Sequence, residues 1–353
     1  MKKAPKSVLI CAVQAPFVVG GAEILVSELR VQLERRGYRV DIANVPFKWY
    51  PISELTRQAL AWRLLDVTES NGTPVDLVIP TKFPSYLVRH PRKVAWLFHQ
   101  HREAYDLYGT SYCSFTDAPE DQQVRRAIYA MDASGLGECR DIFTISRNVA
   151  NRLERYNQLP ATPLYPPPQH LGQYRSDDYG DYLFYAGRLD RLKRLDLAID
   201  AMARVGCSAK LKIAGTGPLR KELEKQIARL GIADRVELLG FVSSEDLVDL
   251  YARCRAAYYA PLNEDYGYVT VEAFLSRKPV LTTHDAGGPL EFVTEGESGY
   301  VADPEPAAIA AAIDALWKLP QKRLAEYGAT GHARVVGITW DAVIDQLTAG
   351  LND

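Results

Sequence analysis

Cysteine is scarce in this sequence, and its spacing suits neither a metal site nor a redox motif. The 353 residues include five cysteines without a Cys-x-x-Cys pair: Cys11, Cys113, Cys139, Cys207 and Cys254. Such a pattern is typical of a chain that folds in a reducing compartment, without a disulfide framework. No Asp-x-Asp motif lies at the end of an expected strand either, so the sequence predicts no metal ion and no other cofactor.

Long apolar runs are missing too. The basic start Met1–Lys6 leads into Val8–Val13, which is too short for the core of a signal peptide or for a transmembrane helix. We find no run long enough to span a membrane elsewhere in the sequence. These features predict a cytoplasmic protein whose contact with membranes is at most peripheral.

A third missing feature is the Gly-x-Gly-x-x-Gly fingerprint of dinucleotide-binding enzymes. The turn after the first expected strand, Ala15–Gly21, reads APFVVGG and lacks it. This counts against a nicotinamide-dependent oxidoreductase. Gly20 and Gly21 still let the backbone approach a ligand closely, just before a helix whose first N–H groups suit an anion.

Length and composition predict a soluble protein of two domains, with 47% hydrophobic and 24% charged residues. Residues 1–175 contain 22 Lys+Arg and 17 Asp+Glu, a net +5, and the remainder contains 20 and 27, a net −7. A basic half suits an anionic membrane or a phosphorylated acceptor, and a chance distribution of surface charges explains it equally well. The excess is too small to predict nucleic-acid binding.

Short apolar runs alternate with amphipathic stretches, as in a parallel sheet covered by helices. In the first half the expected strands are Ser7–Val13, Arg39–Val45, Asp76–Pro80, Lys93–Phe98 and Asp141–Ile145, and the clearest helices are Ala22–Arg36 and Ser146–Tyr156. The prolines at 166–168 interrupt the pattern, because they lack N–H donors and fix an extended backbone.

The second half repeats the alternation. Its expected strands are Asp181–Gly187, Ala209–Ala214, Arg235–Leu239, Arg255–Pro261 and Pro279–Thr283. Its expected helices are Leu195–Arg204, Leu219–Leu230, Ser244–Cys254, Gly267–Ser276, Glu305–Leu319, Gln321–Val335 and Thr339–Leu351. The pattern predicts two doubly wound α/β domains with ligands at the carboxyl ends of their strands.

The sharpest motif is EDYGYVTVE, in which Glu264 and Glu272 lie eight positions apart. Eight residues of helix rise about 12 Å, which is too far for a shared metal or for the paired acid and base of a glycosidase. Carboxylates so spaced suit the two ends of an extended ligand rich in hydroxyls. One surface glutamate and one helix glutamate are the structural alternative.

Two glycine turns precede that motif. Gly187-Arg188-Leu189 ends a strand, and Arg188 and Lys193 are the kinds of cation that clamp a diphosphate, although a solvated basic turn has the same composition. Gly215-Thr216-Gly217-Pro218-Leu219 ends the next strand and opens a helix, with Pro218 suited to its first turn. Its N–H groups can cradle phosphate or sugar, although most such turns are purely structural.

In this order, the motifs resemble those of the family 4 retaining glycosyltransferases with the GT-B fold (glycosyl transferases group 1). Ala286–Glu291 and Gly296–Gly299 also look like later loops of that family. The resemblance covers essentially the whole chain and implies two Rossmann-like domains facing each other across a cleft. We expect residues 1–165 to bind the acceptor, residues 166–338 to bind a nucleotide-sugar donor, and residues 339–353 to form a helix that crosses back to the first domain.

The resemblance also implies roles for individual residues. Arg188 and Lys193 would hold the donor's diphosphate, Glu272 the ribose hydroxyls and Glu264 the transferred sugar. His99, with His101 as second choice, would contact the sugar near the reacting carbon, unless both histidines are structural. The remaining donor-binding residues implied are Gly21, Gly187, Gly215, Gly217, Phe241, Val242, Tyr266 and Gly267, with the nucleobase at Gly240–Val242.

The resemblance thus predicts a metal-independent retaining hexosyltransferase that uses a UDP-, GDP- or ADP-sugar. Its acceptor would be a glycan, a lipid-linked molecule or a small molecule. Trp49–Pro51 and Tyr105–Tyr112 are aromatic segments that suit either an acceptor pocket or simple packing. A non-catalytic sugar-nucleotide-binding protein and a GT-B epimerase or phosphorylase are the alternatives.

Overall fold

The computed structural model describes residues 5–17 and 20–351. Val18 and Val19 of the first glycine turn and Met1–Ala4 of the basic start lie outside the described residues. The chain divides into two compact units. The N-terminal unit comprises residues 1–166 and 339–353, and the C-terminal unit comprises residues 167–338.

The N-terminal unit is built on parallel strands. β1 (Ser7–Gln14) lies between β2 (Arg39–Pro46) and β5 (Leu77–Pro80), while β7 (Asp141–Thr144) lies between β6 (Val94–Leu97) and β8 (Thr162–Pro163). Isolated parallel bridges from Val78 to Lys93 and from Lys82 to His99 join the two groups. A small antiparallel hairpin, β3 (Glu69–Ser70) and β4 (Thr73–Pro74), precedes β5.

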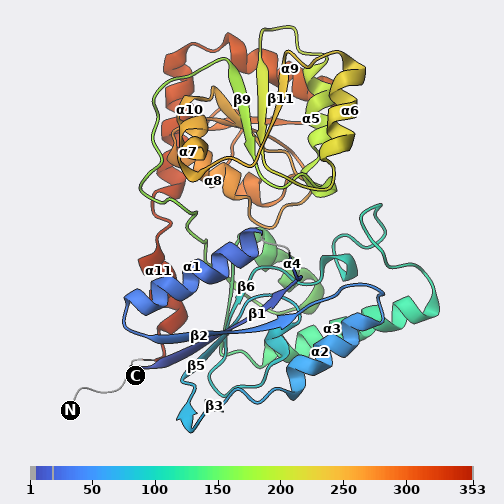
Figure 1. The fold of residues 1–353 in the computed structure, drawn as a ribbon, viewed down its shortest axis with the longest axis vertical. Coiled ribbons are helices and arrows are strands. Elements are labelled where there is room, and N and C mark those ends of the chain that lie inside the picture. Colours follow the sequence, from blue (N-terminus) through green and yellow to red (C-terminus); the bar gives the residue numbers. More distant parts are fainter. Residues whose placement is uncertain (1–4, 18–19, 352–353) are drawn as a thin grey trace. The chain divides into compact units, whose positions relative to one another are not determined.

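Five helices of this unit are α1 (Gly21–Arg35), α2 (Glu54–Leu64), α3 (Pro119–Gly137), α4 (Arg147–Asn157) and α11 (Trp340–Thr348). α1 contacts α11, and α3 contacts both α2 and α4 (Figure 1). α11 is anchored by Trp340, whose ring centroid lies 6.2 Å from that of Trp96 in β6. Ser146 caps α4 as expected, because its hydroxyl accepts a hydrogen bond from the Val149 N–H at 3.0 Å.

The C-terminal unit is a six-stranded parallel sheet with the order β11-β10-β9-β12-β13-β14. The strands are β9 (Tyr182–Ala186), β10 (Lys210–Ala214), β11 (Val236–Gly240), β12 (Ala256–Tyr258), β13 (Val280–Thr283) and β14 (Gly299–Ala302). In sequence order this is 3-2-1-4-5-6, the doubly wound arrangement, which reverses direction between β9 and β12. Ligands of such sheets bind beyond the carboxyl ends of the strands at that reversal.

Helices cover both faces of this sheet (Figure 1). α5 (Leu195–Met202) packs against α6 (Arg220–Leu230) and α9 (Pro306–Lys318), while α8 (Tyr268–Leu275) packs against α10 (Gln321–Val335). α7 (Ser244–Arg253) lies between β11 and β12 in the chain. α8 begins directly after Gly267, which places the second glutamate of the EDYGYVTVE motif inside a helix and the first before it.

The sequence analysis gave no bounds for α2, α3 and β14, nor for the two-residue strands β3, β4 and β8. α3 begins with two polar turns and buries only Ile128, Asp132, Gly135 and Leu136, so its apolar face is too narrow to recognise. β14 is a short edge strand with two half-buried residues. α6 starts at Arg220 after the cap Leu219, so Pro218 precedes the helix rather than occupying its first turn.

α10 approaches the end of α8 through two glycines. A Cβ on Gly328 would lie 1.9 Å from the carbonyl oxygen of Arg277, and one on Gly331 would lie 2.1 Å from the ring of Phe274. Both distances are far below van der Waals contact, so a larger residue forces the two segments apart.

We expect Gly328→Ala to lower the free energy of unfolding by about 1–3 kcal/mol, because the new methyl group meets backbone that cannot move aside. Gly337→Ala is the matched control, since a Cβ there would have no heavy atom within 4 Å. Urea titrations of both variants measure the effect. Equal midpoints for Gly328→Ala and Gly337→Ala would contradict this account of the contact between α8 and α10.

Candidate functional site

The centre of the candidate site is an ion pair in the C-terminal unit. Lys193 ends a short 3-10 helix (Arg191–Lys193) in the loop after β9, and its ammonium pairs with the carboxylate of Glu264, in the loop after β12. The ammonium also lies 3.4 Å from the hydroxyl of Tyr259. Burial disfavours the charged ammonium, but the charge of Glu264 outweighs it and raises the pKa of Lys193 above its ordinary value.

Arg188 lies in the same loop, and its side chain is exposed. Its carbonyl oxygen accepts a hydrogen bond from the hydroxyl of Tyr185 at 2.9 Å, which holds the backbone of the turn against β9. The guanidinium forms no ion pair with any of the described residues. It is therefore a cation at the strand end that is open to an anionic ligand.

The expected glycines of this region permit close approach between neighbouring loops. A Cβ on Gly215 would lie 1.8 Å from the carbonyl oxygen of Gly187, and one on Gly217 would lie 2.4 Å from that of Leu189. The turn after β10 therefore packs directly on the turn after β9, which carries Arg188. This contact gives Gly215 and Gly217 a structural role, whereas their role in donor binding stays a prediction.

Glu272 has different partners from Glu264. Its carboxylate accepts a hydrogen bond from the hydroxyl of Tyr251 in α7 at 2.7 Å, and the ring of Tyr174 packs edge-on against Tyr251. Burial raises the pKa of Glu272 above its ordinary value, although the hydroxyls of Tyr251 and Tyr174 oppose that shift. The two glutamates are thus held separately, one by an ammonium and the other by a tyrosine hydroxyl.

The turn between the two glutamates is shaped by Gly267. Its φ of 91° lies in the left-handed region, and a Cβ there would come within 2.7 Å of the ring of Tyr259. Tyr266, just before it, is buried. Gly267 thus brings the start of α8 against the same Tyr259 whose hydroxyl lies near Lys193.

The expected nucleobase loop follows β11. Gly240 has a φ of 75°, and the side chain of Phe241 is 86% exposed, while Val242 is half-buried. An aromatic side chain that finds so little cover within its own unit is unusual, because aromatic rings generally bury a large apolar area. The ring is available to a planar ligand.

In the N-terminal unit, Gly20 and Gly21 open α1. The side chain of Glu23 accepts a hydrogen bond from the Gly20 N–H at 2.9 Å and also pairs with the ammonium of Lys82 at 3.0 Å. The sequence analysis missed Lys82, although a lysine placed just after a strand of four buried residues is a signal of the same kind as Arg188. An anion near Gly21 would therefore meet an ammonium as well as a helix N-terminus.

His99 and His101 differ in their surroundings. His99 is half-buried, and its Nδ1 donates a hydrogen bond to the carbonyl oxygen of Gln100 at 2.8 Å, since a carbonyl can only accept. The ring of His101 contacts those of Phe83 and Phe115, with ring centroids 5.6 and 6.0 Å apart. Burial, with the neighbouring His99, lowers the pKa of His101 to about 4, so it is neutral near pH 7. Its packing suits a structural histidine.

A buried polar network supports the loop that carries these histidines. The amide of Gln100 donates to Asn157 at 2.6 Å, Asn157 donates to the hydroxyl of Tyr105 at 3.3 Å, and Tyr105 donates to Asp132 at 2.7 Å. Gln100 and Asp132 are fully buried. Burial raises the pKa of Asp132 to about 7, against opposing hydrogen bonds from Tyr105 and other neighbours.

This shift makes the N-terminal unit sensitive to pH. A carboxyl whose pKa is higher in the folded than in the unfolded state stabilises the folded state most at low pH. This contribution to the free energy of unfolding falls as pH rises from about 4 to about 7. Asp132→Asn keeps an acceptor for Tyr105 but does not titrate. We therefore expect its free energy of unfolding, relative to that of the wild type, to rise by roughly 2–4 kcal/mol between pH 4 and pH 8.

Urea unfolding followed by tryptophan fluorescence suits this test, because Trp49, Trp62, Trp96 and Trp340 of the five tryptophans belong to the N-terminal unit. Glu120→Gln, an exposed substitution on the same helix, is the control. A stability difference between Asp132→Asn and wild type that stays constant with pH would show that Asp132 does not titrate in this range.

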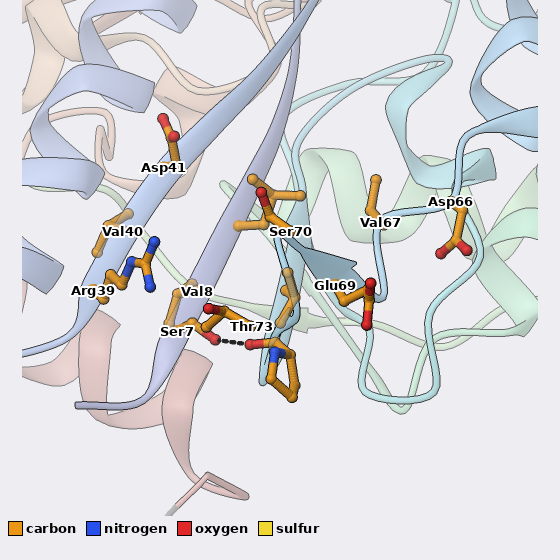
Figure 2. Close-up of a pocket in the computed structure, with 13 residues that line it drawn as sticks. Ser7, Val8, Arg39, Val40, Asp41, Asp66, Val67, Glu69, Ser70 and Thr73 are labelled. Carbon is orange, nitrogen blue, oxygen red and sulfur yellow. Dashed lines mark hydrogen bonds between the residues drawn. The ribbon is translucent and has the colours of Figure 1, made fainter. Parts of the chain in front are cut away.

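A cavity of about 300 Å³ lies elsewhere in the N-terminal unit, at the amino ends of β1 and β2 and beside the β3–β4 hairpin (Figure 2). There the Ser7 hydroxyl donates a hydrogen bond to the carbonyl oxygen of Pro74 at 2.6 Å. Arg39 and Asp41 contribute to its wall. The cavity is at the opposite end of the strands from Gly21 and Lys82, and the predicted site residues do not line it.

Residues 5–17 and 20–351 contain no group of three or more His, Cys, Asp or Glu side chains arranged to hold a metal ion. None of the helices in that part of the chain combines the length and the apolarity needed to cross a bilayer.

Comparison with protein families finds one matching model, described as "Glycosyl transferases group 1", over residues 169–331. An alpha-D-kanosaminyltransferase of Streptomyces kanamyceticus is 32% identical over 153 residues, which are 42% of this chain and 39% of that protein. The human alpha-1,3/1,6-mannosyltransferase ALG2 is 28% identical over 43% of this chain and 40% of its own length. The chain thus spans about two fifths of the length of these relatives.

Solved structures match over nearly the whole chain. Anabaena HepE in complex with UDP and glucose superimposes with a TM-score of 0.69 at 18% identity, covering 98% of this chain and 99% of that one. Sucrose-phosphate synthase from Thermosynechococcus elongatus gives 0.74 at 19% identity and 97% of both chains. At such low identity the likeness concerns the fold, and it confirms the predicted GT-B fold of two Rossmann-like domains.

Proposed function

We propose that the whole chain is a retaining glycosyltransferase, because residues 169–331 match the family model described as "Glycosyl transferases group 1". It moves a hexose-type sugar from a nucleotide-diphosphate sugar to a glycan, a lipid-linked molecule or a small molecule. The observation that carries this proposal is the Lys193–Glu264 pair, which joins the loops after β9 and β12 where the strand order reverses. The UDP complexes of HepE, a neighbour in fold, support a nucleotide donor.

In the proposed reaction, the bond between the anomeric carbon of the sugar and the diphosphate oxygen breaks, and the nucleoside diphosphate leaves with its negative charge. The ammonium of Lys193 and the guanidinium of Arg188 stabilise that charge as it develops, without a metal ion. Lys193 is already desolvated and oriented by Glu264 and Tyr259, so little reorganisation is needed when the anion arrives. The acceptor hydroxyl attacks the anomeric carbon from the front face, so a new glycosidic bond forms with the configuration of the sugar retained. The proton of that hydroxyl passes to the departing diphosphate oxygen.

The two glutamates act as acceptors at different ends of the donor. Glu264 receives hydrogen bonds from hydroxyls of the transferred sugar next to the leaving group, because it lies beside Lys193. Glu272 receives hydrogen bonds from the ribose, with Tyr251 fixing the orientation of its carboxylate. The exposed ring of Phe241 and the backbone of Val242 receive the nucleobase.

The N-terminal unit is assigned to the acceptor, and the roles of His99 and Gly21 at the sugar and the phosphate stay predictions. So do a cytoplasmic location and peripheral contact with an anionic membrane. The second candidate function is a sugar-nucleotide-binding protein without transferase activity. Such a protein would use the same donor-binding residues but would transfer no sugar, so a transferase assay distinguishes the two functions.

The proposal is tested by thermal-shift measurements with UDP-, GDP- and ADP-sugars. A ligand present at about 100 times its Kd adds about 2.7 kcal/mol to the stability of the folded state, so at least one donor should raise Tm by several degrees. Lys193→Ala and Arg188→Ala should reduce that shift strongly, because each removes a cation from the diphosphate site. Lys322→Ala, at an exposed position in α10, is the control.

No shift with any of the three donor classes would contradict the proposed function. A shift that survives in both Lys193→Ala and Arg188→Ala would exclude the diphosphate clamp. A wild-type protein that binds a donor but transfers no sugar to a panel of glycan, lipid-linked and small-molecule acceptors would favour the non-catalytic alternative.

A second pair of variants distinguishes the proposed roles of the two glutamates. We expect Glu272→Gln to weaken donor binding about tenfold or more, because a charged acceptor is lost from the ribose. Glu264→Gln should lower kcat more than affinity, since Glu264 contacts the sugar that moves. Glu237→Gln, exposed in β11, is the control. Calorimetry measures Kd for the donor, and steady-state kinetics measure kcat. Unchanged Kd and kcat in both variants would show that Glu264 and Glu272 do not belong to the donor site.

A further inference from the structure

Arg194 has a backbone conformation that is unusual for its residue type. It follows Lys193 directly and precedes α5, with φ 50° and ψ 44° in the left-handed region. For a residue with a Cβ this conformation is strained, and it persists only where surrounding contacts impose it. Glycine would avoid the cost, so the side chain of Arg194 must supply something that glycine lacks.

The guanidinium of Arg194 bonds to two other loops. It donates to the carbonyl oxygens of Ala260 at 3.0 Å and Pro261 at 2.9 Å, in the loop after β12. It makes a bidentate contact with Asp285 at 2.6 and 2.7 Å and donates to the Thr283 hydroxyl at 2.9 Å, at the end of β13 and just after it. Only 11% of the side chain is exposed. This set of acceptors matches the planar fork of an arginine and would be incompletely filled by a lysine.

Backbone hydrogen bonds connect the same three loops. The Leu262 N–H donates to the Leu192 carbonyl at 2.8 Å, and the Asn263 N–H donates to the Asp285 carbonyl at 2.7 Å. The Glu264 N–H donates to the Ala286 carbonyl at 2.7 Å. The guanidinium and these three bonds therefore form one layer across the carboxyl ends of β9, β12 and β13.

We propose that Arg194 is a positioning residue, whose guanidinium joins the loops after β9, β12 and β13 and so fixes the Lys193 ammonium against the Glu264 carboxylate. This inference rests on the proposed function, which gives the Lys193–Glu264 pair its role in donor binding. Lys193 is the preceding residue in the chain, and Glu264 lies three residues beyond Pro261. A shift of either loop would thus move one member of the pair away from the other.

The charge of Asp285 supports this arrangement. Burial would raise the pKa of its carboxyl, but hydrogen bonds from Arg194 and Thr283 overcome that tendency and hold it below the ordinary value. Asp285 is therefore an anion at neutral pH, and Arg194 has a fixed counter-charge. Removing either partner leaves the other partly buried without its ion pair, which is costly.

The test compares Arg194→Gly with Arg194→Lys, Asp285→Asn and the control Arg255→Ala. Glycine fits the left-handed backbone, so Arg194→Gly removes the guanidinium without adding strain. Arg255 is also a C-terminal-unit arginine that donates to carbonyl oxygens, those of Trp317 and Leu319, but it lies before β12 and not after it. Variants are compared at temperatures equally far below their own Tm.

Two readouts are used, and the first does not depend on the proposed function. Amide hydrogen exchange at Leu262, Asn263 and Glu264 should become at least about tenfold faster in Arg194→Gly than in Arg255→Ala, because the layer opens. With the donor found by thermal shift, kcat/KM should fall on the order of 10- to 100-fold in Arg194→Gly and in Asp285→Asn. Arg194→Lys should recover less than half of the loss in log(kcat/KM) seen in Arg194→Gly, since an ammonium lacks the several planar N–H donors of a guanidinium.

Unchanged exchange at these amides in Arg194→Gly would overturn the inference, whether or not a donor is found. Equal kcat/KM in Arg194→Gly and Arg255→Ala, with a donor that the wild type uses, would overturn it as well and would leave the proposed function intact. A wild type that binds no donor would contradict the proposed function alone, and the exchange measurement would then decide the role of Arg194.

Discussion

Between β9 and β12 the strand order of the C-terminal unit reverses, and this constraint governs the candidate site. The chain leaves β9 toward one side of the sheet and β12 toward the other, so the loops that follow them meet beyond the carboxyl ends. Lys193 comes from the first loop and Glu264 from the second, although they are 71 positions apart in the chain. Their ion pair is therefore a consequence of topology, and other contacts of the site are arranged around it.

Glycine turns make this arrangement compact. Gly215 and Gly217 let the turn after β10 lie directly on the backbone that carries Arg188, and Gly267 lets α8 start against Tyr259. Each of these positions would clash with backbone or with a ring if a Cβ were added. The same glycines that suggest phosphate binding in the sequence are thus required by packing alone, and their presence by itself says little about a ligand.

The regular elements of both units could be predicted because periodic apolar residues determine them. The runs Ser7–Val13 and Gln321–Val335 differ from β1 and α10 by one residue at most. α3 was missed because its first two turns are polar. Contacts between distant side chains have no local signature, so the partnership of Lys193 with Glu264 was not predicted, although both residues were singled out. Tyr251 and Arg194 were missed for the same reason, since each acquires its meaning only from its neighbour in space.

Glu264 and Glu272 show how environment separates two identical side chains. An acid and base pair would require both carboxyl groups to face one reacting bond with pKa values pushed apart. Here Glu264 is paired with the ammonium of Lys193, and Glu272 is buried against a tyrosine hydroxyl that donates to it. In the proposed function both carboxylates are fixed acceptors, and they recognise hydroxyl groups at two separate places on one ligand.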